Sequence, residues 1–190
     1  EPLEQFLDRE LPERTRAVKM YYLIGAPGER DEDAAAIAAE ARRAQRRLAT
    51  RDVTVSLSVN PMVSKAHTPM QWTAMPERNA LRNRLRALKK DLAAGPRISV
   101  QGLGVRDAEI QTMLSLGDRR LAPVIAHVAE HGASRSSWMA GLKQHGLSMD
   151  FYARRNRGRG ELLPWNVLDH GRAREDLYEQ FEDIMAAAAG

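Results

Sequence analysis

Residues 17–29, AVKMYYLIGAPGE, decide how the rest of this chain is interpreted. Apart from Lys19, the residues from 18 to 24 are β-branched, aromatic or large and apolar. A run of this kind is typical of a parallel strand that is covered on both faces. A glycine–proline turn ends the run, and Asp31 or Asp33 can cap a helix after it. The stretch therefore predicts a strand, a turn and a helix in an α/β fold.

The same order of strand and helix is repeated further along. Residues 33–48 are rich in alanine with an arginine-bearing face, which predicts an amphipathic helix, and VTVSLSV at 53–59 alternates as a strand does. Leucines at 81, 85, 88 and 92 form a helical stripe that Gly95 and Pro96 should end, and a third short strand follows at 97–101. Alternating strands and helices predict a parallel sheet with right-handed crossovers.

The remaining segments are expected to be mostly helical. Residues 1–12 resemble the end of a helix, and helices are predicted at 107–116, 119–131, 134–144 and 175–188, with a long ordered loop from 151 onward. Three strands make a small sheet with an open edge, so we expect either half of a larger barrel or pairing with another copy. The predicted fold class is α/β, with βα units over residues 1–104 and a helical extension over residues 105–190.

Composition excludes several classes of function. The chain has no cysteine, which rules out disulfides, thiolate nucleophiles and cysteine-ligated zinc or iron–sulfur sites within it. No apolar run approaches the ~20 residues of a membrane span, and residues 1–16 are too charged for a signal peptide. We therefore expect a cytoplasmic protein with no membrane partner. The net charge of +4 comes mostly from arginine and allows an acidic partner.

Chemistry is expected first at the carboxyl ends of the strands, where α/β folds bind ligands. The turn after the first strand is followed by an acidic cluster that begins at Glu29, which would repel a phosphate and attract a cation or ribose hydroxyls. In the alternative interpretation, the glycines shape the turn and the acids complement the helix dipole. The loop after the second strand offers Lys65 and His67.

Two further patterns each leave an alternative open. His127 and His131 are spaced as a metal-binding pair on a helix, but no third ligand lies nearby, and a solvated helix end is the alternative. The run ARRNRGRG at 153–160 resembles an RNA-binding arginine–glycine patch. A basic face at 78–90, which bears Arg82 and Arg86, is compatible with the same function.

Taken together, these loops resemble the radical S-adenosylmethionine (radical SAM) enzymes. KMYYLIGAPGERDED at 19–33 and VSLSVNPMVSKAHTPMQW at 55–72 are similar to the fifth and sixth strands of their barrel, most closely in a family of uncharacterised enzymes that often carry an upstream cobalamin-binding-like domain. Later residues match in the same order: GDRR at 117–120, Trp138, DFY at 150–152, LPW at 163–165 and HG at 170–171. The resemblance spans residues 18–171.

The resemblance implies that this chain is the C-terminal half of such an enzyme. The complete enzyme would hold a four-iron four-sulfur cluster on three cysteines in its first half and cleave S-adenosylmethionine to a 5′-deoxyadenosyl radical. The half-barrel described by this sequence lacks those cysteines, so it should bind no cofactor or metal and catalyse nothing alone. Its partner would be the missing N-terminal half-barrel, on the same or a separate chain.

The same resemblance implies which residues form the site. At the strand edges, the cofactor would contact five residues: Leu23, Ile24, Gly25, Glu29 and Asn60. The loop that closes over the substrate would contribute Lys65, His67 and Thr68. Two alternatives remain. One is a non-enzymatic, basic RNA-binding module, and the other is a half-barrel that associates with itself through its open sheet edge.

Overall fold

The structure, a computed structural model, describes residues 2–93 and 98–189. The chain forms two compact units. The first, here called the sheet unit, comprises residues up to Pro61 together with Asn79–Gly104, and the second, the helical unit, comprises Met62–Arg78 together with the residues from Val105 onward. The predicted helix stop at Gly95 and Pro96, and Arg97 of the predicted third strand, lie outside the described residues.

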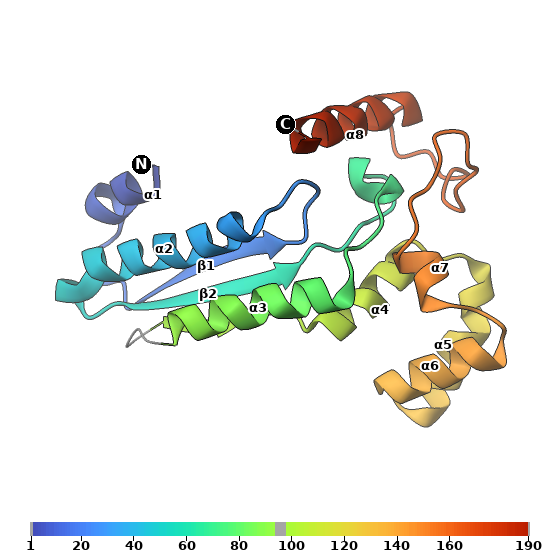
Figure 1. The fold of residues 1–190 in the computed structure, drawn as a ribbon, viewed down its shortest axis with the longest axis horizontal. Helices are drawn as coiled ribbons and strands as arrows, with labels where there is room; N and C mark the ends of the chain where they lie inside the picture. The colour runs from blue at the N-terminus through green and yellow to red at the C-terminus, as the bar shows by residue number, and fades with distance from the viewer. Residues whose placement is uncertain (1, 94–97, 190) are drawn as a thin grey trace. The chain divides into compact units, whose positions relative to one another are not determined.

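The sheet unit is built on three parallel strands in the order β1 (Ala17–Ile24), β2 (Thr54–Pro61) and β3 (Ile98–Gln101). Before β1, a short helix α1 (Pro2–Gln5) continues as a π-helical turn η1 (Phe6–Glu10). The helix α2 (Asp31–Leu48), with its last turn η2 (Ala49–Arg51), connects β1 to β2, and α3 (Arg78–Leu92) precedes β3. The α/β class and the parallel sheet are thus confirmed (Figure 1).

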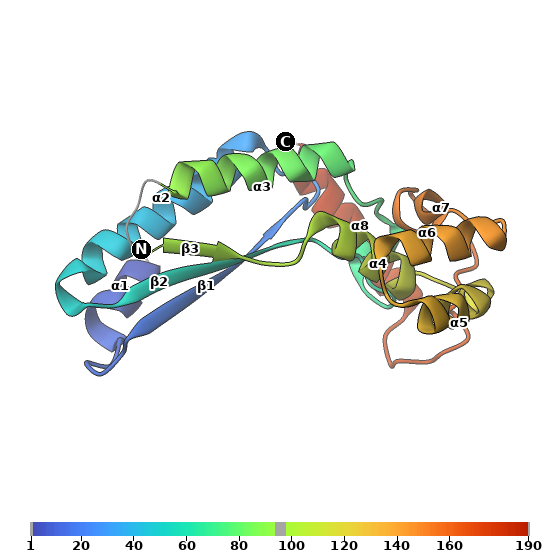
Figure 2. The same ribbon diagram turned by 90° about the horizontal axis from the view of Figure 1, so that it is seen from below.

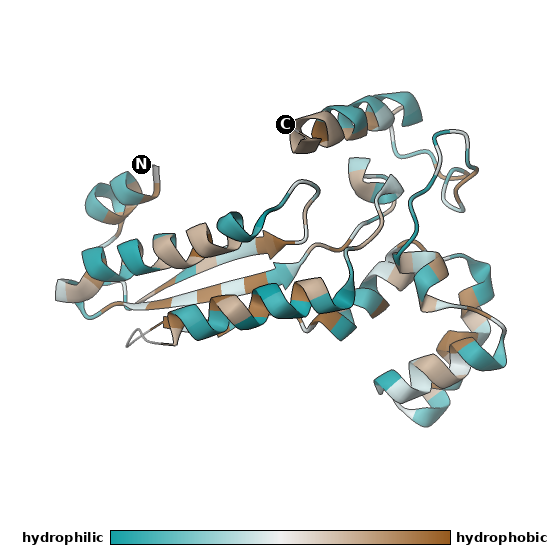
Figure 3. Ribbon diagram, in the orientation of Figure 1, coloured by the Kyte–Doolittle hydropathy of each residue, from teal (hydrophilic) through white to brown (hydrophobic). Residues whose placement is uncertain are grey.

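Both long helices of this unit lie on the same face of the sheet (Figure 2). Alternate residues of the strands point into this layer, and hydropathy alternates along β2 accordingly (Figure 3). Met20 and Val55 join Ala44, Leu48 and Leu7 in one buried cluster. The small alanines of α2 let that helix approach the sheet closely, and burial of these side chains is the main stabilising term for the unit.

Within the described residues of the sheet unit, no second layer of helices covers the opposite face of the sheet. Tyr21 is 70% exposed and Leu23 is 63% exposed, whereas Met20 and Ile24 between them are buried. The prediction that the first strand is covered on both faces is therefore wrong. The sequence run is apolar on both faces, but among the described residues of the sheet unit only one face has a layer packed on it.

The helical unit contains η3 (Pro69–Trp72), α4 (Val105–Ser115), η4 (Arg119–Leu121), α5 (Ala122–His131), α6 (Arg135–Gln144), α7 (Met149–Ala153) and α8 (Arg174–Ala189). The predicted helices are present with ends shifted by up to two residues, the one at 119–131 as η4 followed by α5. The loop predicted from 151 onward begins only after α7, which ends at Ala153. Val124 and Val128 on α5 pack with Trp138 and Leu142 on α6 in one core cluster. A second cluster joins Trp72 of η3 to Trp165 and to Leu177 of α8.

Among the described helices, none combines the length and the apolarity that crossing a membrane requires.

Candidate functional site

The turn after β1 is closed by its own side chains. Gly25 and Gly28 have φ values of +86° and +76°, which favour glycine. The Gly25 amide donates a hydrogen bond to the Glu29 carboxylate, whose side chain is only 8% exposed. Arg84 of α3 lies 3.4 Å from that carboxylate and donates to the Glu29 carbonyl at 3.0 Å. Glu29 therefore holds the turn and ties it to α3.

Asp31 and Asp33, which follow this turn, also form contacts within the sheet unit. The Asp33 carboxylate accepts a hydrogen bond from the Arg30 amide at 2.8 Å, which caps α2, and Asp31 lies 3.2 Å from Arg84 Nε. Acidic side chains in the first turn also complement the helix dipole. These contacts favour the interpretation in which the acids stabilise the turn and α2.

Leu23 and Asn60 lie side by side on the uncovered face of the sheet, because they are register partners on β1 and β2. The Asn60 side chain is anchored: Oδ1 accepts from the Leu103 amide at 2.8 Å, and Nδ2 donates to Ser58 Oγ at 3.2 Å. Ile24 is 1% exposed on the helix-covered face. A ligand on the uncovered face would therefore meet the side chains of Leu23 and Asn60, but only the backbone of Ile24.

The predicted substrate loop belongs to the helical unit and is tightly hydrogen-bonded. Thr68 Oγ1 donates to the Lys65 carbonyl at 2.8 Å, and the His67 amide donates to Gln71 Oε1 at 3.1 Å. His67 has a φ of +57°, an uncommon value for a residue other than glycine. Lys65 is exposed. The loop thus presents the Lys65 ammonium to solvent and holds His67 in a defined position.

Gln71 joins this loop to the distant LPW motif. Its side chain is 97% buried, and Oε1 also accepts from Trp165 Nε1 at 2.5 Å. The His67 and His170 rings meet edge to face with centroids 4.1 Å apart. Three of the motifs that carry the resemblance, HTP-x-QW, LPW and HG, therefore contact one another within the helical unit.

A pocket of about 350 Å³ opens beside these contacts. His67, Gln71 and His170 line it, together with polar side chains of the following loop that include Asp169 and Arg172. Burial lowers the pKa of His67, and the nearby His170 lowers it further. A neutral imidazole in a polar pocket can accept or donate a proton or a hydrogen bond near neutral pH. Gln71, Trp165 and His170 were not predicted as site residues, although their motifs had been noted.

The remaining motifs of the resemblance form a second group of contacts. Asp118 binds Arg120 of its own GDRR motif at 2.7 Å and accepts a hydrogen bond from the Tyr152 hydroxyl of the DFY motif at 3.3 Å. The hydrogen bond from Arg120 lowers the pKa of Asp118. Trp138 packs in the same core cluster as Tyr152. These motifs thus build the interior of the helical unit.

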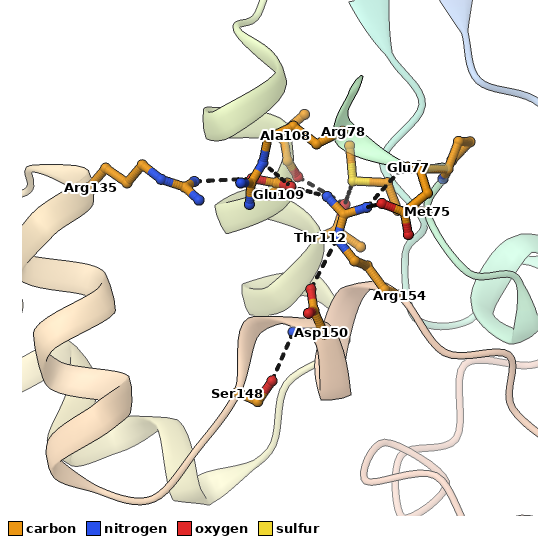
Figure 4. A network of polar contacts seen from close by, with 11 residues as sticks. Met75, Glu77, Arg78, Ala108, Glu109, Thr112, Arg135, Ser148, Asp150 and Arg154 are labelled. Atoms are coloured by element: carbon orange, nitrogen blue, oxygen red, sulfur yellow. Dashed lines mark hydrogen bonds and ion pairs between the residues drawn. The ribbon is translucent and has the colours of Figure 1, made fainter. Parts of the chain in front are cut away.

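The most buried charged residue described in the helical unit, Glu109, is one that no sequence pattern identified. Glu109 on α4 is 0% exposed and binds three arginines, with Arg78 at 2.8 Å, Arg135 at 3.0 Å and Arg154 also in contact (Figure 4). Burial by itself raises the pKa of Glu109, but the hydrogen bonds from the three guanidinium groups outweigh it, and the pKa is lowered. Its partners lie 26 to 45 residues away in sequence, so no local pattern identifies them.

The structure shows the contacts of the histidine pair at 127 and 131 and of the basic run at 153–160. The rings of His127 and His131 stack 4.2 Å apart, and His131 Nδ1 lies 2.8 Å from the His127 carbonyl. Over residues 2–93 and 98–189, no group of three or more metal-ligating side chains is present. In the run at 153–160, Arg154 and Arg155 are paired with carboxylates and Arg157 is buried, which leaves Arg159 exposed.

Comparisons of the chain with protein-family models, with curated proteins and with solved structures found no match.

Proposed function

We propose that this chain is the C-terminal portion of a radical SAM enzyme, and that its sheet unit is half of a barrel that an N-terminal half-barrel completes. In such an enzyme, the helices lie outside the barrel and the ligands inside it. The uncovered face of the sheet would then be part of the barrel interior. This arrangement explains why β1 carries apolar residues on both of its faces although only one of those faces is buried.

The observation that carries the proposal is the pairing of Leu23 with Asn60 on this face, next to the Gly25 turn. These are residues that the resemblance assigns to the cofactor. An exposed leucine offers an apolar surface for an adenine ring, and a fixed amide offers a donor and an acceptor for its polar edge. The contact of HTP-x-QW with LPW and HG further supports the proposal, because motifs that form one ordered series also form one cluster of contacts.

The chemistry would depend on the partner half. A four-iron four-sulfur cluster held there would supply the electron that cleaves S-adenosylmethionine. The residues of this chain would bind and orient the adenosyl group at the strand edge, and the loop with His67 would position a substrate. In isolation the chain has no cysteine with which to hold a cluster.

The test is an NMR titration of the isolated chain with S-adenosylmethionine or 5′-deoxyadenosine. We expect shifts of the Leu23 methyl groups and of the Asn60 side-chain amide at millimolar ligand. Leu23→Ala should reduce the shifts, whereas Tyr21→Ala, two residues earlier on the same face, should not. Absence of shifts at about 10 mM, or a stoichiometric iron–sulfur cluster in the isolated chain, would contradict the proposal.

The alternative function, RNA binding, is favoured by one observation. Arg82, Arg86, Lys89 and Lys90 are all exposed on α3, spaced so that they share one face of the helix. Within the described chain, no carboxylate partner is found for Arg82, Lys89 or Lys90. Such a stripe attracts phosphate groups, and its affinity should fall steeply with salt because bound counterions are released.

A charge-matched comparison tests this alternative. The triple variant R82Q/R86Q/K90Q should weaken binding to single-stranded RNA and reduce the salt slope, whereas R9Q/R14Q/R16Q, which removes the same charge near the N-terminus, should leave the affinity within about twofold. Fluorescence anisotropy at several salt concentrations provides the measurement. Equal losses in both variants would show nonspecific attraction and exclude α3 as an RNA site.

A further inference from the structure

A second pocket, separate from the one beside His67, lies in the helical unit among the arginines of the basic run. It has a volume of about 130 Å³ and is lined by residues of the loop after α4, of α7 and of the loop after α7. Three arginines contribute to it, namely Arg120, Arg155 and Arg157. The volume suits a group of a few atoms.

Two of these arginines are already neutralised. Arg120 binds Asp118 at 2.7 Å, and Arg155 binds Glu161 through two contacts of 2.5 and 2.8 Å. Both guanidinium groups also lie over the Phe151 ring, at 5.1 and 4.6 Å from its centroid. Each arginine of the pocket rim is therefore held in place by a carboxylate and an aromatic ring.

Arg157 is different, because within the described residues it forms no ion pair in direct contact, although the carboxylate of Glu161 is close enough to act on its charge. It is 94% buried, and its Nη2 donates to the Tyr152 carbonyl at 2.6 Å. Its Nη1 is enclosed and has no hydrogen-bond acceptor in the described part of the chain. Burial and the charge of Arg155 together lower the pKa of Arg157 to about 10, against the opposing effect of Glu161. A buried guanidinium without an ion pair in direct contact is costly, because its desolvation is only partly compensated.

Three positive and two negative side chains line the pocket, so the net charge of its lining is +1, and Arg157 is the arginine among them that forms no ion pair within the described residues. We propose that this pocket binds a small oxyanion, a carboxylate or phosphate group with one negative charge, which balances the positive charge that Arg157 brings to the pocket lining. Guanidinium groups match the geometry of both anions. This inference does not depend on the proposed radical chemistry.

The test uses calorimetry on the full chain with inorganic phosphate and, separately, with acetate, in chloride buffer at constant ionic strength. Arg157→Gln should weaken binding by about tenfold or more, since the excess positive charge of the pocket lining is lost. Arg159→Gln, an exposed arginine two residues away that does not line the pocket, should bind like the native chain. Binding of phosphate alone would identify a phosphate site, and binding of both anions a site for oxyanions in general.

A second variant keeps the proposal testable if Arg157→Gln does not fold. Glu161→Gln frees Arg155 from its carboxylate and should tighten binding several-fold, because the pocket then gains a positive charge. The side-chain NMR signals of Arg157 should also shift with phosphate. If neither anion binds at 50 mM, or if Arg157→Gln and Arg159→Gln bind equally well, the proposal is wrong.

Discussion

At the scale of single residues, Glu109 should matter most for the stability of the helical unit. Its fully buried carboxylate forms ion pairs with three arginines, of which Arg154 is largely buried. Glu109→Gln leaves those charges uncompensated and should lower the free energy of unfolding by about 3–5 kcal/mol. All three tryptophans belong to this unit. Urea denaturation monitored by tryptophan fluorescence will therefore measure the free energy of unfolding of the helical unit.

Glu77→Gln is the matched control, since Glu77 is 81% exposed and pairs with the same Arg154. Exposed ion pairs contribute little, so the control should change stability by less than about 1 kcal/mol. If Glu109→Gln lowers the free energy of unfolding no more than the control does, the ion pairs of Glu109 do not stabilise the helical unit.

The lowered pKa of Glu109 also predicts how stability depends on pH. The ionised carboxylate contributes stability that is fully present above the ordinary glutamate pKa of about 4.3 and is lost as the pH falls through the lowered value. The helical unit of the native chain should therefore lose stability in acid below about pH 4, and Glu109→Gln should lose less over the same range. The free energy of unfolding of both proteins, measured from pH 6 to pH 3, will check this. An equal loss of stability in the two proteins over this range would contradict the prediction.

At the scale of secondary-structure elements, the approach of β3 to β2 depends on Gly102. Its φ is +149°, and a Cβ atom there would lie 2.0 Å from the Val59 carbonyl oxygen. Gly102→Ala should therefore cost about 1–3 kcal/mol from backbone strain alone and loosen the pairing of β3. Hydrogen exchange of the β2 and β3 amides should accelerate, whereas Gly158→Ala, where a Cβ meets open space, should leave exchange unchanged. Equal protection in both variants would exclude the role of Gly102.

At the scale of the whole molecule, the open face and edge of β1 should promote association. Tyr21 and Leu23 are exposed beside unpaired strand backbone, and such edges pair with other chains unless charges protect them. We expect the isolated chain to dimerise at tens of micromolar in sedimentation velocity. The double variant Y21K/L23K should be monomeric, whereas Val167→Lys, at an 86% exposed position of the helical unit, should still dimerise. A monomeric native chain at 100 µM would contradict this prediction.

Much of the fold could be predicted because local patterns report it directly. The apolar run before Gly25 predicted β1 with its observed ends, and the alternation VTVSLSV predicted β2. The short helix α7 was missed because it spans only five residues, too few for a helical period to appear. Among the site residues, Leu23 and Asn60 could be placed at one edge because parallel strands end together.

By itself, the sequence determined the order of strands and helices, the parallel sheet and the absence of thiolate ligands, since each follows from composition or local periodicity. The tertiary structure alone decided which face of β1 is covered, that Gln71 contacts Trp165, and that Glu109 binds three arginines. It also decided that Arg157 is buried without an ion pair among the described residues. The physical reason is the same in each case. Periodicity shows that a side chain is buried, whereas its partner, up to 94 residues away here, is chosen by the packing of distant segments.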